Sequence, residues 1–165
     1  MPQSIQDLVN QLHLLPHPEG GYYRETYRSD LSHLPPNALG IEEERNISTA
    51  IYFLLTGGNF SAFHRIKQDE LWHHYMGDAI AVHTISPEGE YQKLLLGKDL
   101  AKGELPQHLV KGGTWFASES LGEYSLAGCT VAPGFDFADF ELPPQEELLD
   151  LFPQHCSEIE RLTRE

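Results

Sequence analysis

Short apolar runs alternate with Gly- and Pro-rich turns along most of this chain. An early strand is predicted at 21–28, where aromatic residues favour an extended backbone. Further strands are predicted at 47–55, 60–66, 70–75, 79–85, 91–96, 108–110, 115–117, 124–131 and 135–142. Regular short strands between such turns are typical of an all-β sandwich or barrel.

The two ends of the chain carry a helical pattern instead. Residues 4–13 have apolar side chains on one face, with Ser4 as the expected N-cap and Asp7 three residues later. The segment 144–165 is predicted to be helical with a break at Pro153. We therefore expect flanking N- and C-terminal helices around the strands.

The length of the chain indicates the number of domains, and its charge limits the kinds of partner that we expect. The 165 residues suit a single domain over 1–165, and residues 29–45 are expected to form a long loop within it. The formal net charge is −14, from 25 acidic and 11 basic residues. This argues against nucleic acid or an anionic membrane as a partner, because both require a positive field.

From the sequence we expect neither a signal peptide nor a membrane span. No apolar run approaches the ~18 residues of a membrane span, and the first residues lack a basic patch followed by an apolar stretch. Cys129 and Cys156 lie in dissimilar contexts, so we expect packing residues rather than a disulfide. A cytoplasmic location is the expectation.

One spacing in the chain indicates a site. His64 follows Gly58 after five residues, Glu70 follows a polar turn, and Gly77 comes six residues later. Alternation along two adjacent strands places His64 and Glu70 on the same side, which is the interior in a small closed barrel. The side chains predicted to line that interior are His64, Ile66, Glu70, Trp72, His74 and, on the following strand, His83.

Such a mixture of titratable, aromatic and apolar groups is typical of a small-molecule site. The alternative is that these polar groups only satisfy one another within a core. Several ionisable side chains inside one barrel are costly without a function, which favours the site.

Residues 18–28, Pro-Glu-Gly-Gly-Tyr-Tyr-Arg-Glu-Thr-Tyr-Arg, form a second signature. In an acidic protein, Arg24 or Arg28 offers a planar fork for a phosphate or carboxylate. The alternative, which has equal weight, is an edge strand with exposed charges.

These motifs resemble those of the cupin superfamily. The stretch 58–77 is similar to the first cupin motif, G(X)5HXH(X)3E(X)6G, with Ile66 at its second His, and 111–116 is similar to part of the second motif, with Phe116 at its His. The resemblance extends over about residues 5–145, and is to a cupin type-5 branch of unknown function. It implies a jelly-roll (double-stranded β-helix) barrel and a homodimer.

The same resemblance bears on metal binding. Ile66 and Phe116 stand at two of the four usual ligand positions, and a mononuclear site needs three or four donors. We therefore predict no metal and no cofactor. The alternative is a metal-dependent cupin in which His74 or His83 substitutes as a ligand.

A fainter resemblance is to the metal-independent dTDP-sugar 3,5-epimerases. Residues 21–25, Gly-Tyr-Tyr-Arg-Glu, are similar to their first strand, and His64 resembles a barrel His that acts as base. Their acid tyrosine falls near Ala127, so no acid partner for His64 is identified.

The resemblance implies an isomerase- or epimerase-like enzyme with His64 as base and Glu70 orienting or protonating. We expect a small polar ligand, either a carbohydrate or an anionic metabolite. A non-catalytic ligand-binding cupin is the alternative. The expected ligand contacts are Arg24, Glu25, Ile66, Trp72, His74 and His83.

Overall fold

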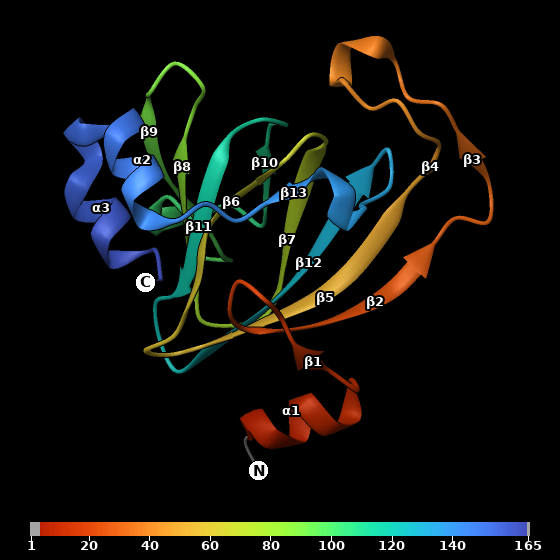
Figure 1. Cartoon of the computed structure of the whole chain (residues 1–165). Helices are drawn as coiled ribbons and strands as arrows, with labels where there is room; N and C mark the ends of the chain where they lie inside the picture. The colour runs from red at the N-terminus through yellow and green to blue at the C-terminus, as the bar shows by residue number, and fades with distance from the viewer. Residues whose placement is uncertain (1–3, 165) are drawn as a thin grey trace.

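Two antiparallel sheets face each other in the computed structural model, which describes residues 4–164 (Figure 1). The first sheet contains, in spatial order, β1 (Leu15–Pro16), β2 (Tyr22–Arg28), β5 (Thr49–Thr56), β12 (Tyr124–Ala132), β7 (Asp69–Gly77) and β10 (Gln107–Val110). The second contains β13 (Phe140–Glu141), β6 (Phe60–Ile66), β11 (Trp115–Ser120), β8 (Ile80–Ile85) and β9 (Tyr91–Leu96). The predicted jelly-roll fold class is confirmed.

Helices flank the sheets as expected. They are α1 (Ile5–Gln11), α2 (Gln145–Leu151) and α3 (Cys156–Arg161), with 3-10 turns at η1 (Asn37–Leu39), η2 (Leu100–Lys102), η3 (Phe137–Asp139) and η4 (Pro153–His155). The predicted N-cap is present, because the Ser4 hydroxyl accepts from the Asp7 amide and the Asp7 carboxylate accepts from the Ser4 amide. Along the described part of the chain, every helix is too short or too polar to cross a bilayer.

The expected loop at 29–45 forms an arm with some structure of its own. It contains β3 (Ser32–His33), which pairs with β4 (Arg45–Asn46) in a separate two-stranded sheet. Figure 1 shows this arm extending from the ends of β2 and β5, away from the body of the molecule.

Apolar side chains fill one end of the space between the sheets. Trp72 packs edge-to-face against Phe53 and Phe116, with Val82 and Leu96 in the same buried cluster. A second cluster lies on the outer side of the five-stranded sheet, beneath α2 and α3 (Figure 1). The other end of the interior holds buried polar groups together with apolar and aromatic side chains.

Two details of the strand prediction are wrong. On β8 the interior positions are Ile80 and Val82, so His83 faces the opposite side, where it shares register with Ala117 beneath the C-terminal helices. Of the strand predicted at 135–142, only Phe140–Glu141 is extended strand, as β13. Phe137–Asp139 form a 3-10 turn instead, because the Asp136 side chain accepts from the Ala138 amide and caps it.

Candidate functional site

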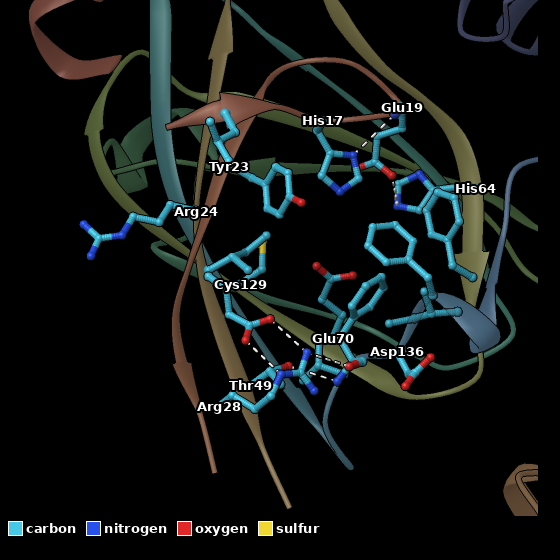
Figure 2. Close-up of a pocket in the computed structure, with 18 residues that line it drawn as sticks. His17, Glu19, Tyr23, Arg24, Arg28, Thr49, His64, Glu70, Cys129 and Asp136 are labelled. Atoms are coloured by element: carbon cyan, nitrogen blue, oxygen red, sulfur yellow. Dashed lines mark hydrogen bonds and ion pairs between the residues drawn. The ribbon is translucent and has the colours of Figure 1, made fainter. Parts of the chain in front are cut away.

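A cavity of about 510 Å³ occupies the end of the interior opposite the Trp72 cluster (Figure 2). Its walls come from the loop before β2, from strands β2, β5, β6, β7 and β12, and from the segment that contains η3. Asp139 fixes that last segment, because its buried carboxylate accepts from Arg45 at 2.8 and 3.0 Å and from Gln68 at 2.7 Å. The cavity wall is therefore held by charge-assisted hydrogen bonds rather than by a regular strand.

A tight turn brings two ionisable side chains over this cavity. The His17 amide donates to the Gly21 carbonyl at 2.9 Å, and the Gly20 amide returns to the His17 carbonyl at 3.1 Å. The Glu19 carbonyl accepts from the Ala62 amide at 2.8 Å, which attaches the turn to β6. His17 and Glu19 consequently face the interior next to His64 (Figure 2).

The Glu19 carboxyl lies between two imidazole rings. Nδ1 of His64 donates to the Ala62 carbonyl at 2.7 Å, so a neutral His64 has its lone pair on Nε2, which lies 3.1 Å from Oε2 of Glu19. Nδ1 of His17 accepts from the Glu19 amide at 3.3 Å and lies 3.5 Å from Oε1 of Glu19. Two lone pairs thus face one carboxyl, which requires a proton between them.

The surroundings place that proton on Glu19. Burial, with the nearby Glu70 carboxyl, raises the pKa of Glu19 well above its usual value. Burial lowers the pKa of His64 to about 3 and that of His17 to about 4. The two imidazoles are therefore neutral at pH 7, burial favours the protonated form of Glu19, and neither nitrogen of His64 is free to face a ligand.

Glu70 is the titratable group that points into the middle of the cavity (Figure 2). It is 9% exposed, and burial raises its pKa to about 7, although a hydrogen bond from Cys129 opposes this rise. Burial also raises the pKa of the Cys129 thiol well above its usual value, so that sulfur is no thiolate nucleophile near neutral pH.

Two hydrogen-bond donors face Glu70 across the cavity. The Tyr23 hydroxyl points inward from β2 (Figure 2), and its ring packs edge-to-face on His17 with centroids 4.6 Å apart. Since Nδ1 of neutral His17 is an acceptor, its proton is on Nε2. A carboxyl that titrates near neutrality therefore shares one cavity with a phenol and an imidazole N–H.

The two arginines of β2 are not free to bind an anion in the way that the sequence suggests. Arg28 donates to both carboxylate oxygens of Glu25 at 2.8 Å, to Asn46 Oδ1 at 2.8 Å and to the Phe135 carbonyl at 3.0 Å, so each of its nitrogens has a protein partner. Arg24 borders the cavity, but its guanidinium points away (Figure 2) and donates to the Leu12 carbonyl. Neither offers a free planar fork to the cavity centre.

The donor set does not fit a metal ion. Ile66 lines the cavity and is 3% exposed, and Phe116 packs on the His64 ring with centroids 4.0 Å apart. Both positions of the motif that normally hold imidazole thus carry apolar side chains, Ile66 in the cavity wall and Phe116 in the adjacent apolar cluster. Over residues 4–164, no three His, Cys, Asp or Glu side chains are grouped so as to hold a metal.

Three of the expected ligand contacts lie elsewhere. Trp72 is part of the apolar cluster that fills the other end of the interior. His74, at the far end of β7, has Nε2 3.0 Å from the Asp78 carbonyl. His83 bonds to Tyr91 at 2.7 Å and to Glu119 at 3.0 Å on the outer face of β8.

Sequence reasoning missed Glu19, His17 and Tyr23 as site residues. A signal was present, because all three belong to the segment 17–28, which contains the second signature. Within that segment, however, only the arginines suggest a function from sequence alone. Only the pairing of the 17–21 turn with β6, distant in sequence, reveals that this segment enters the cavity.

Comparison with known proteins supplies relatives for this architecture. The family described as "Cupin superfamily (DUF985)" matches residues 6–143. The uncharacterized protein YML079W of Saccharomyces cerevisiae is 33% identical over 96% of this chain and 85% of its own length.

Two solved structures are similar over nearly their whole length. A protein from Shewanella oneidensis is 44% identical, with a TM-score of 0.89 and 98% of both chains covered. A hypothetical protein from Leishmania major is 35% identical, with a TM-score of 0.91 over 98% of this chain and 99% of that one. An oxalate decarboxylase from Bacillus subtilis shares only the fold, at 17% identity and a TM-score of 0.56, over 93% of this chain and 37% of its own.

Proposed function

We propose, on the premise that this chain belongs to the cupin superfamily in its DUF985 family, that it is a metal-independent isomerase. Its substrate is a small polar molecule held in the barrel cavity, and the chemistry is proton transfer at carbon. The observation that carries the proposal is Glu70, a buried carboxyl aimed into the cavity whose pKa of about 7 suits both taking and returning a proton.

The cavity supplies the other group that such a reaction needs. When a C–H bond next to a carbonyl breaks, the proton passes to a Glu70 oxygen and the electron pair moves to the carbonyl oxygen. The Tyr23 hydroxyl and the Nε2–H of His17 are donors for that developing oxyanion. Return of the proton to a neighbouring carbon, or to the other face of the same carbon, gives the isomer.

His64 takes a different role from the one the motif implies. Both of its nitrogens are in contact with protein groups, and burial lowers its pKa to about 3, so it is a poor base toward a ligand. In this proposal it accepts the proton of Glu19 in a hydrogen bond and keeps that carboxyl neutral beside Glu70. The base is Glu70, and His64 is a positioning residue.

Deuterium exchange tests the proposal even while the product is unidentified. The protein is incubated with a metabolite library in D₂O, and mass spectrometry detects compounds that gain deuterium at carbon. Glu70→Gln keeps the shape of the side chain and should lower the exchange rate by ~100- to 10,000-fold. His74→Gln is the matched control and should leave exchange unchanged, because His74 lies outside the cavity.

Tyr23→Phe tests whether the Tyr23 hydroxyl donates to the oxyanion or whether the side chain only lines the cavity. Loss of the hydroxyl alone should lower the exchange rate by about 100-fold, with little change in ligand affinity. Exchange at the wild-type rate in Glu70→Gln would remove Glu70 from the mechanism. Binding without any exchange would replace this proposal by the non-catalytic ligand-binding alternative.

A further inference from the structure

The charges around the cavity are unequal. Glu70 and Asp136 border it as acidic groups, whereas Glu25 and Arg28 also border it but form a bidentate ion pair with each other. The remaining donors of Arg28 are directed at Asn46 and a backbone carbonyl. Arg24 borders the cavity too, but its guanidinium points away (Figure 2), so an anion would meet Glu70 and Asp136 and no cation directed at the cavity centre.

Aromatic rings form one wall of the same cavity. Phe135, Phe137 and Phe140 all line it, and they pack edge-to-face on one another with centroids 5.0 to 6.3 Å apart. Phe137 remains 51% exposed, which leaves much of its surface uncovered by protein. Ring faces attract ammonium groups through their quadrupole, and aromatic walls beside carboxylates are a common way to bind organic cations.

Asp136 is placed to add a charge to that wall. It lies between Phe135 and Phe137 in sequence, and Figure 2 shows it at the cavity border. Its Oδ1 accepts from the Ala138 amide at 2.8 Å, whereas Arg28 directs its nitrogens to other acceptors.

We propose that the ligand of this cavity is an organic cation whose ammonium group lies against Phe135, Phe137 and Phe140 beside Asp136, with its reacting part directed toward Glu70. The net charge of −14 favours encounter with such a ligand. This assignment replaces the expected anionic metabolite. It rests on the proposed function for the location of the site, but not on turnover.

Three probes of one shape test the charge preference. Choline, its neutral carbon isostere dimethylbutanol and the carboxylate dimethylbutyrate are titrated separately into the intact protein, with binding measured by NMR shift changes and calorimetry. Choline should bind at least about tenfold more tightly than the neutral isostere, and the carboxylate should show no saturable binding.

Two variants test whether the preference for a cation comes from Asp136 and the aromatic wall. Asp136→Asn keeps the acceptor for Ala138 and removes the charge, so it should weaken choline binding about fivefold and leave the neutral probe unchanged. Phe137→Leu keeps an apolar side chain without a ring face and should weaken choline binding about threefold. His74→Gln is the control and should match wild type with all three probes.

The outcomes separate this inference from catalysis. Saturable choline binding that loses affinity in Asp136→Asn supports the inference even if no compound exchanges deuterium. Equal affinities for choline and its neutral isostere, tighter binding of the carboxylate, or absence of saturable choline binding would each overturn it. Deuterium exchange in an anionic substrate would support the proposed function and overturn this inference alone.

Discussion

At the scale of single residues, burial decides the charge state of the site. A carboxylate near His64 would raise the pKa of the imidazole, but burial acts in the opposite direction and dominates, so that pKa falls to about 3. Burial raises the pKa of Glu19 for the same reason. Burial therefore favours a neutral acid and a neutral imidazole over an ion pair, although the two side chains lie 3.1 Å apart.

Glu70 should make the stability of the fold depend on pH. Its pKa is about 7 in the folded protein, against an ordinary value of 4.5, so the folded state holds the proton more tightly. Its contribution to the free energy of unfolding is therefore complete below pH 4.5 and is lost as pH rises through 7. The difference corresponds to about 3 kcal/mol. Glu70→Gln cannot ionise and should gain up to that amount relative to wild type between pH 5 and pH 8, measured by urea denaturation.

His17 and His64 change the free energy of unfolding with pH in the opposite direction. Their pKa values are lowered from 6.5 to about 4 and about 3, so their contribution is present above pH 6.5 and is lost as pH falls toward those values. Because both remain in Glu70→Gln, the comparison with wild type isolates the carboxyl. A constant difference between the two proteins from pH 5 to pH 8 would contradict the raised pKa of Glu70.

At the scale of elements, the turn at 17–21 depends on glycine. Gly20 has φ +115°, and a Cβ there would lie 2.1 Å from the Phe60 carbonyl oxygen. Gly20→Ala should lower the free energy of unfolding by more than about 2 kcal/mol and displace Glu19 from the cavity. Thermal denaturation measures the first effect.

Gly103→Ala provides the matched control. Gly103 has φ +79° with no atom within 4 Å of an added Cβ, so its substitution carries the backbone cost alone, about 1 kcal/mol. If the two variants lost equal stability, the close approach at Gly20 would not matter to the turn.

Elements that rest on local patterns were predictable, and those that rest on distant partners were not. The fixed spacing around His64 and Glu70 located β6 and β7, since alternation and one short turn determine their facing. The predicted facing of β8 is wrong because Ala79 and Ala81 do not distinguish an inner from an outer face. The segment 135–142 depends on Asp139 binding Arg45, which no local pattern contains.

At the scale of the whole molecule, one edge of the six-stranded sheet is incompletely paired. Within the described residues, β1 pairs only with Tyr22 and Tyr23 of β2, so the rest of β2 has a neighbour on one side only. Exposed apolar side chains continue from this edge along the β3–β4 arm, with Tyr27 55%, Leu31 68% and Leu34 56% exposed. An open edge beside apolar surface favours pairing with a second chain.

We therefore expect a homodimer that buries this edge and the adjacent arm. Leu31→Glu should convert it to a monomer, because a charge at the centre of an apolar interface is not solvated there. Leu100 is equally exposed, at 67%, on a 3-10 turn after β9, so Leu100→Glu should leave the dimer intact. Light scattering after size exclusion measures the mass of each protein. A monomer mass for wild type at micromolar concentration would refute the dimer, and equal masses for the two variants would place its interface elsewhere.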